Sequence, residues 1–382
     1  MKSGLSDIEL VKTIDAQNMR KQDIIVPTAQ IEMLAADALL SVPGFGTFRP
    51  TAHAHRQVAD RIGIPSKYYD RMLQESPELL RENVNHWFQT NPEKRLLRTF
   101  VAPPVHTPGA DPSVVAGVGT ARAFLSDRYR ALDNEQVAAA VLPVISEGGL
   151  KIASANITEK SMYIKAYDPS MEKVIRRGDG LGYGQGHDFR AGGARGPDDV
   201  VHWGVAITNS EVGSGALKVE SFMFRTYCLN GLIFEQVSRR HHVGRVMGGD
   251  DDISQWFADD TVKADDEAFF LKMRDTVRGT LAETSFDAAV DKLSESTGRK
   301  IEGDVAKAVD VTAKHISLTD GEKGGVLRHL IEGGDLTAWG MLNAVTRTAE
   351  DSDSYDRATE LEAAGMKVVN MTGPQWQEVA HA

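Results

Sequence analysis

The densest group of residues that could do chemistry lies between Thr208 and Arg245. This stretch holds the only cysteine of the chain, Cys228, beside an Asn-Gly pair that is typical of a β-turn. A cationic cluster follows a few residues later: Arg239, Arg240, His241, His242 and Arg245. A hairpin that ends in such a cluster is suited to binding an anion, and nucleic acid is the commonest large anion.

A second group of cations lies in a glycine-rich stretch, from Arg176 to Gly196, which contains eight glycines. Its arginines and aromatic residues are Arg176, Arg177, Tyr183, Phe189, Arg190 and Arg195. Arginine binds phosphate and aromatic rings stack on bases, a combination that suits single-stranded nucleic acid. A loop of this length inside a compact domain is typically either functional or disordered. Together with Arg225, the two groups make up the predicted nucleic-acid-binding residues.

The charge of the chain is unevenly divided. The whole sequence has 43 basic and 54 acidic residues, a net charge of -11. Val246–Ala382 contains 14 basic and 27 acidic residues, which leaves 29 basic and 27 acidic residues in the first 245. The near-neutral part therefore carries the cationic cluster, which favours nucleic-acid binding there, although an ordinary solvated surface explains the asymmetry equally well.

Cys228 is the obvious candidate for a nucleophile, with His241 or His242 as its base. The apolar neighbours of Cys228 instead favour a buried and inert thiol. Glu211 lies among glycines and has no second carboxylate nearby in sequence, so a turn or capping role is favoured over acid–base catalysis. No catalytic residue is therefore assigned.

The histidine and aspartate groups do not predict a metal site. His53 and His55, the His241–His242 pair and Asp250–Asp252 lack the spacing of zinc or calcium ligands. No nucleotide-binding glycine pattern occurs in the strand–turn–helix context that it needs. We therefore expect neither a metal nor another cofactor.

The segment from Arg56 to Leu73 has the spacing of a helix-turn-helix, with Lys67, Tyr68 and Arg71 on the second helix. The simpler interpretation is a helical hairpin that buries Val58, Ile62 and Met72. Acidic residues near the supposed DNA-contacting face favour the simpler interpretation.

A chain of 382 residues, 41% hydrophobic and 25% charged, is typical of a soluble protein with two or three domains. The N-terminus lacks an apolar signal core, and no run of about 18 apolar residues predicts a membrane helix. The single cysteine fits a reducing compartment. We therefore expect a cytoplasmic protein without membrane contact.

The periodicity predicts an α+β fold in three parts: an N-terminal helical region (1–93), a central antiparallel sheet with helices (94–247), and an acidic helical C-terminal region (248–382). Helices are expected at 31–40, 52–61, from Ser66 to Phe88 with a restart at Pro77, and at 135–146. Strands are expected at 95–103 and 114–126, and hairpins at 150–158/161–167 and 200–209/216–225. Beyond residue 253 the pattern is helical, with segments at 253–281, 286–294, 304–315, 322–331, 336–348 and 355–364.

Five separated motifs carry a resemblance to a known family. They are IGIPSKYYDRM from Ile62, FLSDRYRALDNE from Phe124, SEVGSGAL from Ser210, FRTYCLNGLI from Phe224 and TAWGMLNAVTR from Thr337. They resemble the phage/plasmid-like domain-of-unknown-function family over roughly residues 40 to 365. The resemblance implies a mobile-element setting and supplies neither an activity nor catalytic residues.

The predicted function is therefore binding of single-stranded nucleic acid, as an annealing or recombination accessory that works as a homo-oligomer. One alternative is a nuclease-like or cysteine/histidine-dependent enzyme centred on Cys228. Another is a protein-interaction module that acts on a host defence factor, or binds a phage protein, through the acidic C-terminal region.

Overall fold

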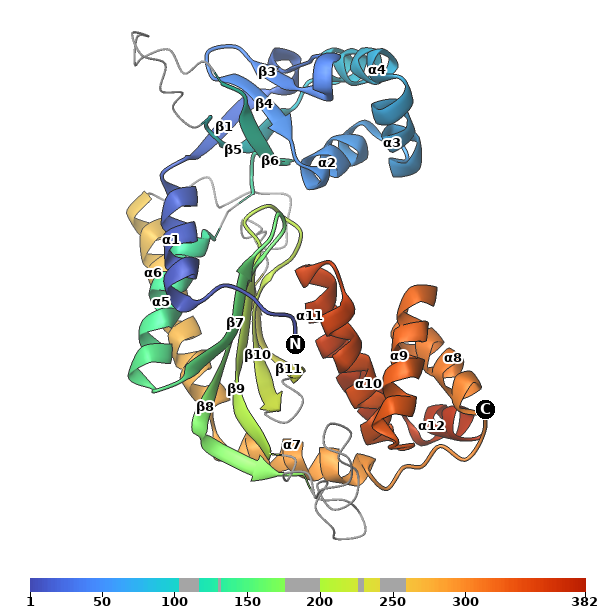
Figure 1. The fold of residues 1–382 in the computed structure, drawn as a ribbon. Coiled ribbons are helices and arrows are strands. Elements are labelled where there is room, and N and C mark those ends of the chain that lie inside the picture. The colour runs from blue at the N-terminus through green and yellow to red at the C-terminus, as the bar shows by residue number, and fades with distance from the viewer. Residues whose placement is uncertain (103–116, 130–131, 176–199, 226–229, 241–258) are drawn as a thin grey trace, which may run out of the picture.

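The computed structural model describes residues 1–102, 117–129, 132–175, 200–225, 230–240 and 259–382. Within these ranges the predicted α+β class is confirmed: helices lie near the N-terminus, two sheets follow, and the C-terminal region is helical (Figure 1). We call the two sheets the N-terminal sheet and the central sheet.

The N-terminal sheet has six strands in the described part of the chain. Their spatial order is β1 (Lys21–Pro27), β5 (Lys94–Phe100), β6 (Gly119–Ser126), β4 (Gly46–Pro50), β3 (Leu40–Val42) and β2 (Glu32–Met33). Neighbouring strands are antiparallel, except that β4 and β6 run parallel. Since β5 and β6 pair with β1 and β4, this sheet combines strands from both sides of the boundary expected near residue 93.

Three helices cover the N-terminal sheet: α2 (Ala52–Ile62), α3 (Ser66–Glu75) and α4 (Pro77–Thr90). The Thr51 side chain caps α2 by accepting the Ala54 N–H, and Gly63 ends the helix with a φ of 70°. Pro77 starts α4, as expected, because a proline at the first helical position gives up no intrahelical hydrogen bond. The apolar faces of these helices pack on Ile24 and Phe124 of the sheet.

The helix expected at 31–40 is wrong. The chain there forms β2, the short 3₁₀ helix η2 (Ala36–Ala38) and the start of β3; a second 3₁₀ helix, η1 (Thr28–Gln30), precedes it. Asp37 has a φ of 57°, which a continuous helix does not allow. Ile31 and Met33 are buried and Glu32 between them is exposed, so the residues alternate with a period of two.

The central sheet is antiparallel throughout. Its strands, in spatial order, are β11 (Asn230–Arg240), β10 (Leu217–Arg225), β9 (Val200–Asn209), β8 (Met162–Val174) and β7 (Lys151–Ile157), so both expected hairpins are confirmed. One side of this sheet carries α1 (Asp7–Asn18), α5 (Asn134–Glu147) and α6 (Asp259–Thr280) (Figure 1). Leu10, Val141 and Val277 from these helices share a core with Val205 of the sheet.

The expected helical C-terminal region is confirmed. It contains α7 (Glu283–Ser296), α8 (Val305–Ile316), α9 (Asp320–Gly333), α10 (Ala338–Asp351), α11 (Tyr355–Val369) and α12 (Gly373–Ala380). Helices α10 and α11 contact β11, and α11 also reaches Lys165 of β8 and Ser154 of β7, so it crosses one face of the central sheet (Figure 1). Trp339 of α10 and Met366 of α11 join Trp203 and Leu232 of the sheet in one core.

Candidate nucleic-acid interface

The β9–β10 hairpin carries the centre of the predicted site. Its strands pair from Lys218↔Thr208 to Arg225↔Val201, which confirms the expected antiparallel arrangement. Gly213 in the connecting turn has a φ of 77°, and a Cβ on it would lie 2.6 Å from Cδ2 of Leu125. Both the backbone conformation and the close packing therefore require glycine at this position.

The β10–β11 register brings predicted cations together at one end of the central sheet. Arg239 is the Cα partner of Lys218, and Arg240 is the Cα partner of Leu217. Exposed Lys160, in the turn between β7 and β8, belongs to the same end, because its carbonyl accepts a hydrogen bond from Ser214 Oγ of the β9–β10 turn. We call Lys160, Lys218, Arg239 and Arg240 the cationic end.

Arg225 does not belong to the cationic end, and its predicted contact with phosphate stays a prediction. It pairs with Asn230 at the opposite end of β10, seven residues beyond Lys218, or roughly 23 Å along the strand. Arg225 is 9% exposed, and its guanidinium donates to Asn343 Oδ1 at 2.8 Å and lies 5.4 Å from the Trp339 ring centroid. These contacts to α10 give Arg225 a role in holding the C-terminal helices against the sheet.

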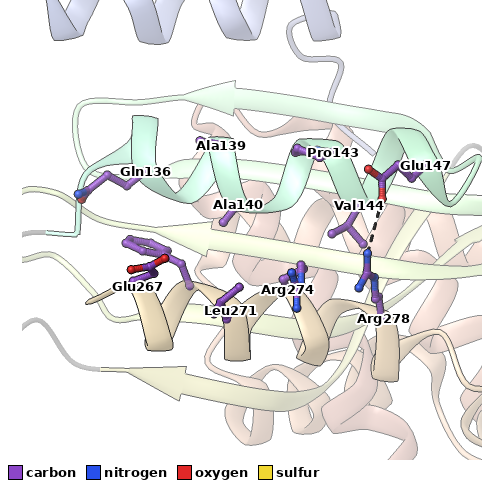
Figure 2. Close-up of a pocket in the computed structure, with 11 residues that line it drawn as sticks. Gln136, Ala139, Ala140, Pro143, Val144, Glu147, Glu267, Leu271, Arg274 and Arg278 are labelled. Atoms are coloured by element: carbon purple, nitrogen blue, oxygen red, sulfur yellow. Dashed lines mark ion pairs between the residues drawn. The ribbon is translucent and has the colours of Figure 1, made fainter. Parts of the chain in front are cut away.

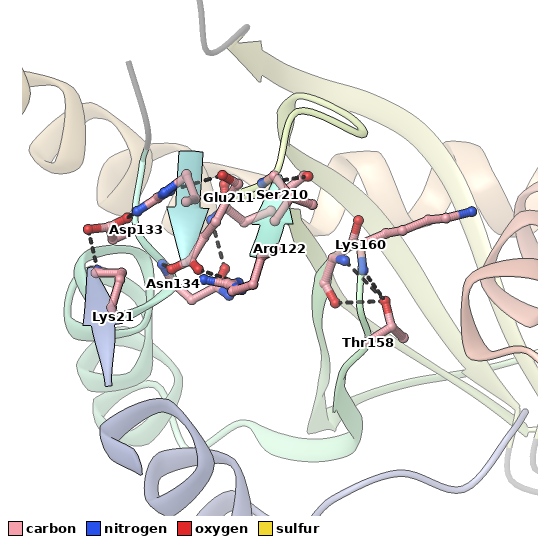
Figure 3. Close-up of polar contacts among 12 residues, drawn as sticks. Lys21, Arg122, Asp133, Asn134, Thr158, Lys160, Ser210 and Glu211 are labelled. Atoms are coloured by element: carbon pink, nitrogen blue, oxygen red, sulfur yellow. Dashed lines mark hydrogen bonds and ion pairs between the residues drawn. The ribbon is translucent and has the colours of Figure 1, made fainter. Parts of the chain in front are cut away.

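The turn beside the cationic end is clamped by the N-terminal sheet and its helices. The Glu211 carboxylate pairs with Arg122 at 2.7 Å and accepts the backbone N–H of Asn134 at 2.6 Å (Figure 3). The Val212 carbonyl accepts from Gln57 Nε2 at 2.8 Å and lies 2.9 Å from His53 Nε2. Glu211 is 5% exposed and therefore has a structural role in the turn, as its sequence position predicts.

Arg98 extends the same clamp toward the start of α5. It is fully buried, and it contacts Asp133 at 2.7 Å, Asp23 at 3.0 Å and the Glu211 carbonyl at 2.9 Å. Burial acts to raise the pKa of Asp133, but the charges and hydrogen bonds of Arg98 and Lys21 outweigh burial and hold that pKa below its usual value. The Arg98–Asp133 pair therefore stays ionised at neutral pH, and Arg98 holds the Glu211 carbonyl at the end of the sheet that carries Lys160 and Lys218.

Figure 3 shows how the clamp and the turn at Lys160 are arranged. Arg122, Glu211 and Asn134 point toward one another, whereas the Lys160 side chain extends away from this group. The Arg122 guanidinium also lies 4.2 Å from the Phe100 ring centroid. The paired charges are therefore structural, and the exposed cation beside them is accessible from solvent.

Most of the other predicted site residues lie outside the described residues. These are Arg176, Arg177, Tyr183, Phe189, Arg190, Arg195, His241, His242 and Arg245, together with Cys228. Of Arg239 and Arg240, the structure describes the backbone in β11. The burial of Cys228 and the contact of residues 176–196 with single-stranded nucleic acid stay predictions.

The segment from Arg56 to Leu73 forms two helices, α2 and α3, joined after Gly63. Val58 and Met72 are buried, and Ile62 packs against the same core, as the helical-hairpin interpretation requires. Arg56 pairs with Asp70 at 2.6 Å across the two helices. This cation is thus already neutralised by a carboxylate of its own hairpin.

Sequence reasoning missed a polar seam between α11 and the central sheet. Buried Lys165 of β8 contacts Glu362 at 2.5 Å and donates to Thr359 Oγ1 at 2.9 Å. Ser154 Oγ lies 2.6 Å from the Tyr355 hydroxyl. The four residues named with Lys165 are at most 8% exposed, so the constellation joins two elements and offers a substrate no access.

Close packing requires a glycine at position 231, directly after Asn230. This pair begins β11, so it is not the two-residue turn that its sequence suggests; Arg225 and Asn230 are Cα partners across residues 226–229. A Cβ on Gly231 would lie 2.8 Å from the Phe222 ring and 3.2 Å from the Glu362 carboxylate. The glycine therefore makes room for the buried acid of the seam.

Two further observations concern only the residues that the structure describes. Among them, no group of three or more His, Cys, Asp or Glu side chains is arranged to hold a metal ion. Across the same ranges, every helix falls short of the length and apolar character needed to cross a membrane.

Comparison with known proteins gives no relative. No protein-family model matches the chain, and neither the curated proteins nor the solved structures include a match to it. The function must therefore be argued from the residues and their geometry.

Proposed function

We propose that this protein binds single-stranded nucleic acid at the cationic end of its central sheet, as an annealing or recombination accessory. The observation that carries the proposal is the register that pairs Lys218 with Arg239 and Leu217 with Arg240. Adjacent strands lie about 4.8 Å apart, so Lys218 and Arg239 hold facing positions on neighbouring strands, and Arg240 follows at the same end of the sheet. A phosphate backbone that crosses this end would meet cations from two strands.

The sequence around this end adds to the electrostatic argument. His241, His242 and Arg245 follow β11 directly, and the Arg/Gly/aromatic stretch 176–196 immediately precedes the part of the chain that forms β9. Arginine and aromatic side chains together give affinity for single strands without requiring a base sequence. The motif resemblance to the phage/plasmid-like family supports a mobile-element setting for this activity and is part of the proposal.

The rigid clamp gives the cationic end a defined position. Binding by pre-positioned cations loses less conformational entropy than binding by mobile side chains. The pairs Arg122–Glu211 and Arg98–Asp133 fix the β9–β10 turn, and Lys160 and Lys218 lie next to that turn. The clamp thus serves as a scaffold and does not itself contact the strand.

Charge reversal tests the proposal. The variant Arg239→Glu/Arg240→Glu should weaken binding to labelled single-stranded DNA or RNA about equally for all sequences, because phosphate contacts carry no base information. The matched control is Lys307→Glu/Lys314→Glu, which makes the same charge change at exposed positions of α8. If both variants lose affinity equally, the change in net charge alone explains the loss. If Arg239→Glu/Arg240→Glu loses no affinity, the cationic end does not bind nucleic acid.

The same titrations separate the alternatives. If no single-stranded, duplex or RNA probe binds at low salt, the alternative function is favoured, in which the protein interacts with another protein through its acidic C-terminal region. If a probe is cleaved, and Cys228→Ala abolishes the cleavage, the enzyme alternative takes precedence.

A further inference from the structure

A groove runs between α5 and α6 on the surface that faces away from the central sheet (Figure 2). Its volume is about 640 Å³, and its floor and walls include Ala139, Ala140, Pro143, Phe270 and Leu271. The lining extends from Gln136 to Glu147 on α5 and from Glu267 to Arg278 on α6, so the groove is roughly 17 Å long.

The composition of the groove favours a helix as its occupant. Two alanines leave room for the side chains of a third helix, and Leu271 is 45% exposed without such a neighbour. Pro143 has no N–H, so the Ala139 carbonyl one turn earlier loses its usual intrahelical donor. Arg274 lies toward one end of the groove, where it also contacts the exposed Asp275 of its own helix at 3.1 Å, and the Arg278–Glu147 contact of 3.5 Å closes that end (Figure 2).

A helix that matches this groove is present on the same side of the molecule. Helix α1 is 12 residues long, or about 18 Å. It buries Leu10 and Ile14 against its own core, while Ile8 is 63% and Val11 42% exposed. Asp15 is exposed on the same ridge as Ile8 and Val11, because residues three, four and seven apart share a helix face.

We propose that α1 of a second copy of this chain occupies the groove between α5 and α6. The lengths of helix and groove agree, Ile8 and Val11 supply apolar side chains to the alanine floor, and Asp15 supplies the charge that complements Arg274. Since α1 lies beside α5 in its own copy, each partner offers both a ridge and a groove. The proposed interface is isologous, with the Asp15–Arg274 contact made twice.

Complementary charge reversals test this pairing. Wild-type protein should be a dimer by light scattering or sedimentation. Asp15→Arg alone and Arg274→Asp alone should each raise the dimer Kd roughly tenfold or more, because each creates two like-charge contacts. Mixing the two variants should restore the dimer as a heterodimer, in which both contacts are attractive again. Lys272→Asp, an exposed position on α6 that does not line the groove, should leave the dimer intact.

The outcomes are distinct. Restoration on mixing requires that both variants fold and that these two residues meet across the interface, so it supports the proposal against a general loss of structure. A monomeric wild type overturns the proposal, as does a dimer that both reversals leave unchanged. If each reversal gives a folded monomer by circular dichroism but the mixture stays monomeric, the groove takes some other occupant.

Discussion

The buried pair Lys165–Glu362 gives the most demanding prediction about what holds α11 on the central sheet. Lys165 is 2% and Glu362 0% exposed, so removing either partner leaves the other as an uncompensated buried charge. Such a loss costs about 3 to 5 kcal/mol. Lys165→Met and Glu362→Leu should therefore each lower the free energy of unfolding by that amount.

The double variant should behave differently. With both charges removed, apolar side chains of similar size fill the seam, and replacement of a buried pair is often neutral or stabilising. Lys165→Met/Glu362→Leu should therefore be no less stable than either single variant. The exposed pair Arg71–Glu75, whose charged atoms lie 2.8 Å apart, is the control, and each of its single replacements should cost less than about 0.5 kcal/mol.

Chemical denaturation followed by tryptophan fluorescence measures these changes, because Trp203 and Trp339 are buried in the core shared by the sheet, α10 and α11. Hydrogen exchange of α11 localises the effect to the seam. If the two single costs simply added in the double variant, or if Lys165→Met cost under about 1 kcal/mol, the account of the seam would be refuted.

Three other predictions follow from particular contacts. Gly231→Ala should cost about 1 to 3 kcal/mol by thermal or chemical melting, because the new methyl meets Phe222 and Glu362, whereas Gly215→Ala, with nothing within 4 Å, should cost far less. Burial lowers the pKa of His55 to about 4, so the unfolded chain takes up a proton at this residue at a higher pH than the folded chain does. The free energy of unfolding should therefore be highest above pH 6.5 and fall toward pH 4. His55→Gln should reduce this dependence on pH, as measured by melts at several pH values. Arg225→Ala should lower the melting temperature by removing the Asn343 and Trp339 contacts, and unchanged affinity of the folded variant for nucleic acid would separate this role from phosphate binding.

The sequence predicted strands β7 to β10 and the C-terminal helices because their signals are local, whereas β11 (Asn230–Arg240) was not expected as a strand. Glycines bounded the hairpins, and capping residues such as Thr319 and Ser354 began helices at the expected places. Helix α12 was missed, although Thr372 and Gln375 form a capping box before it and Pro374 fits its first turn.

The N-terminal sheet was missed for two reasons. Alanine and leucine between Ile31 and Leu40 suggested a helix, and they masked the period-two burial that the strands require. The pairings β1–β5 and β4–β6 are distant along the chain, so the local pattern could not place β5 and β6 in the same sheet as Lys21–Pro27.

The candidate site was predicted in part. Alternation and turn residues placed Arg239 and Arg240 at the end of a hairpin, which the backbone register confirms. Arg225 was predicted to bind phosphate together with them, but it lies at the other end of β10. The burial of Arg225 depends on Asn343 and Trp339, which come more than a hundred residues later, and no local sequence pattern indicates such a partner.

The salt dependence of binding tests the central claim most directly. Fluorescence anisotropy with labelled single-stranded DNA, at several salt concentrations, gives the slope of log K against log salt, which falls by about 0.7 for each phosphate contact. The account predicts tight binding at low salt with a steep negative slope, made shallower by about 1.4 in Arg239→Glu/Arg240→Glu and unchanged in Lys307→Glu/Lys314→Glu. Absence of binding at low salt, or equal slopes in all three proteins, would contradict it.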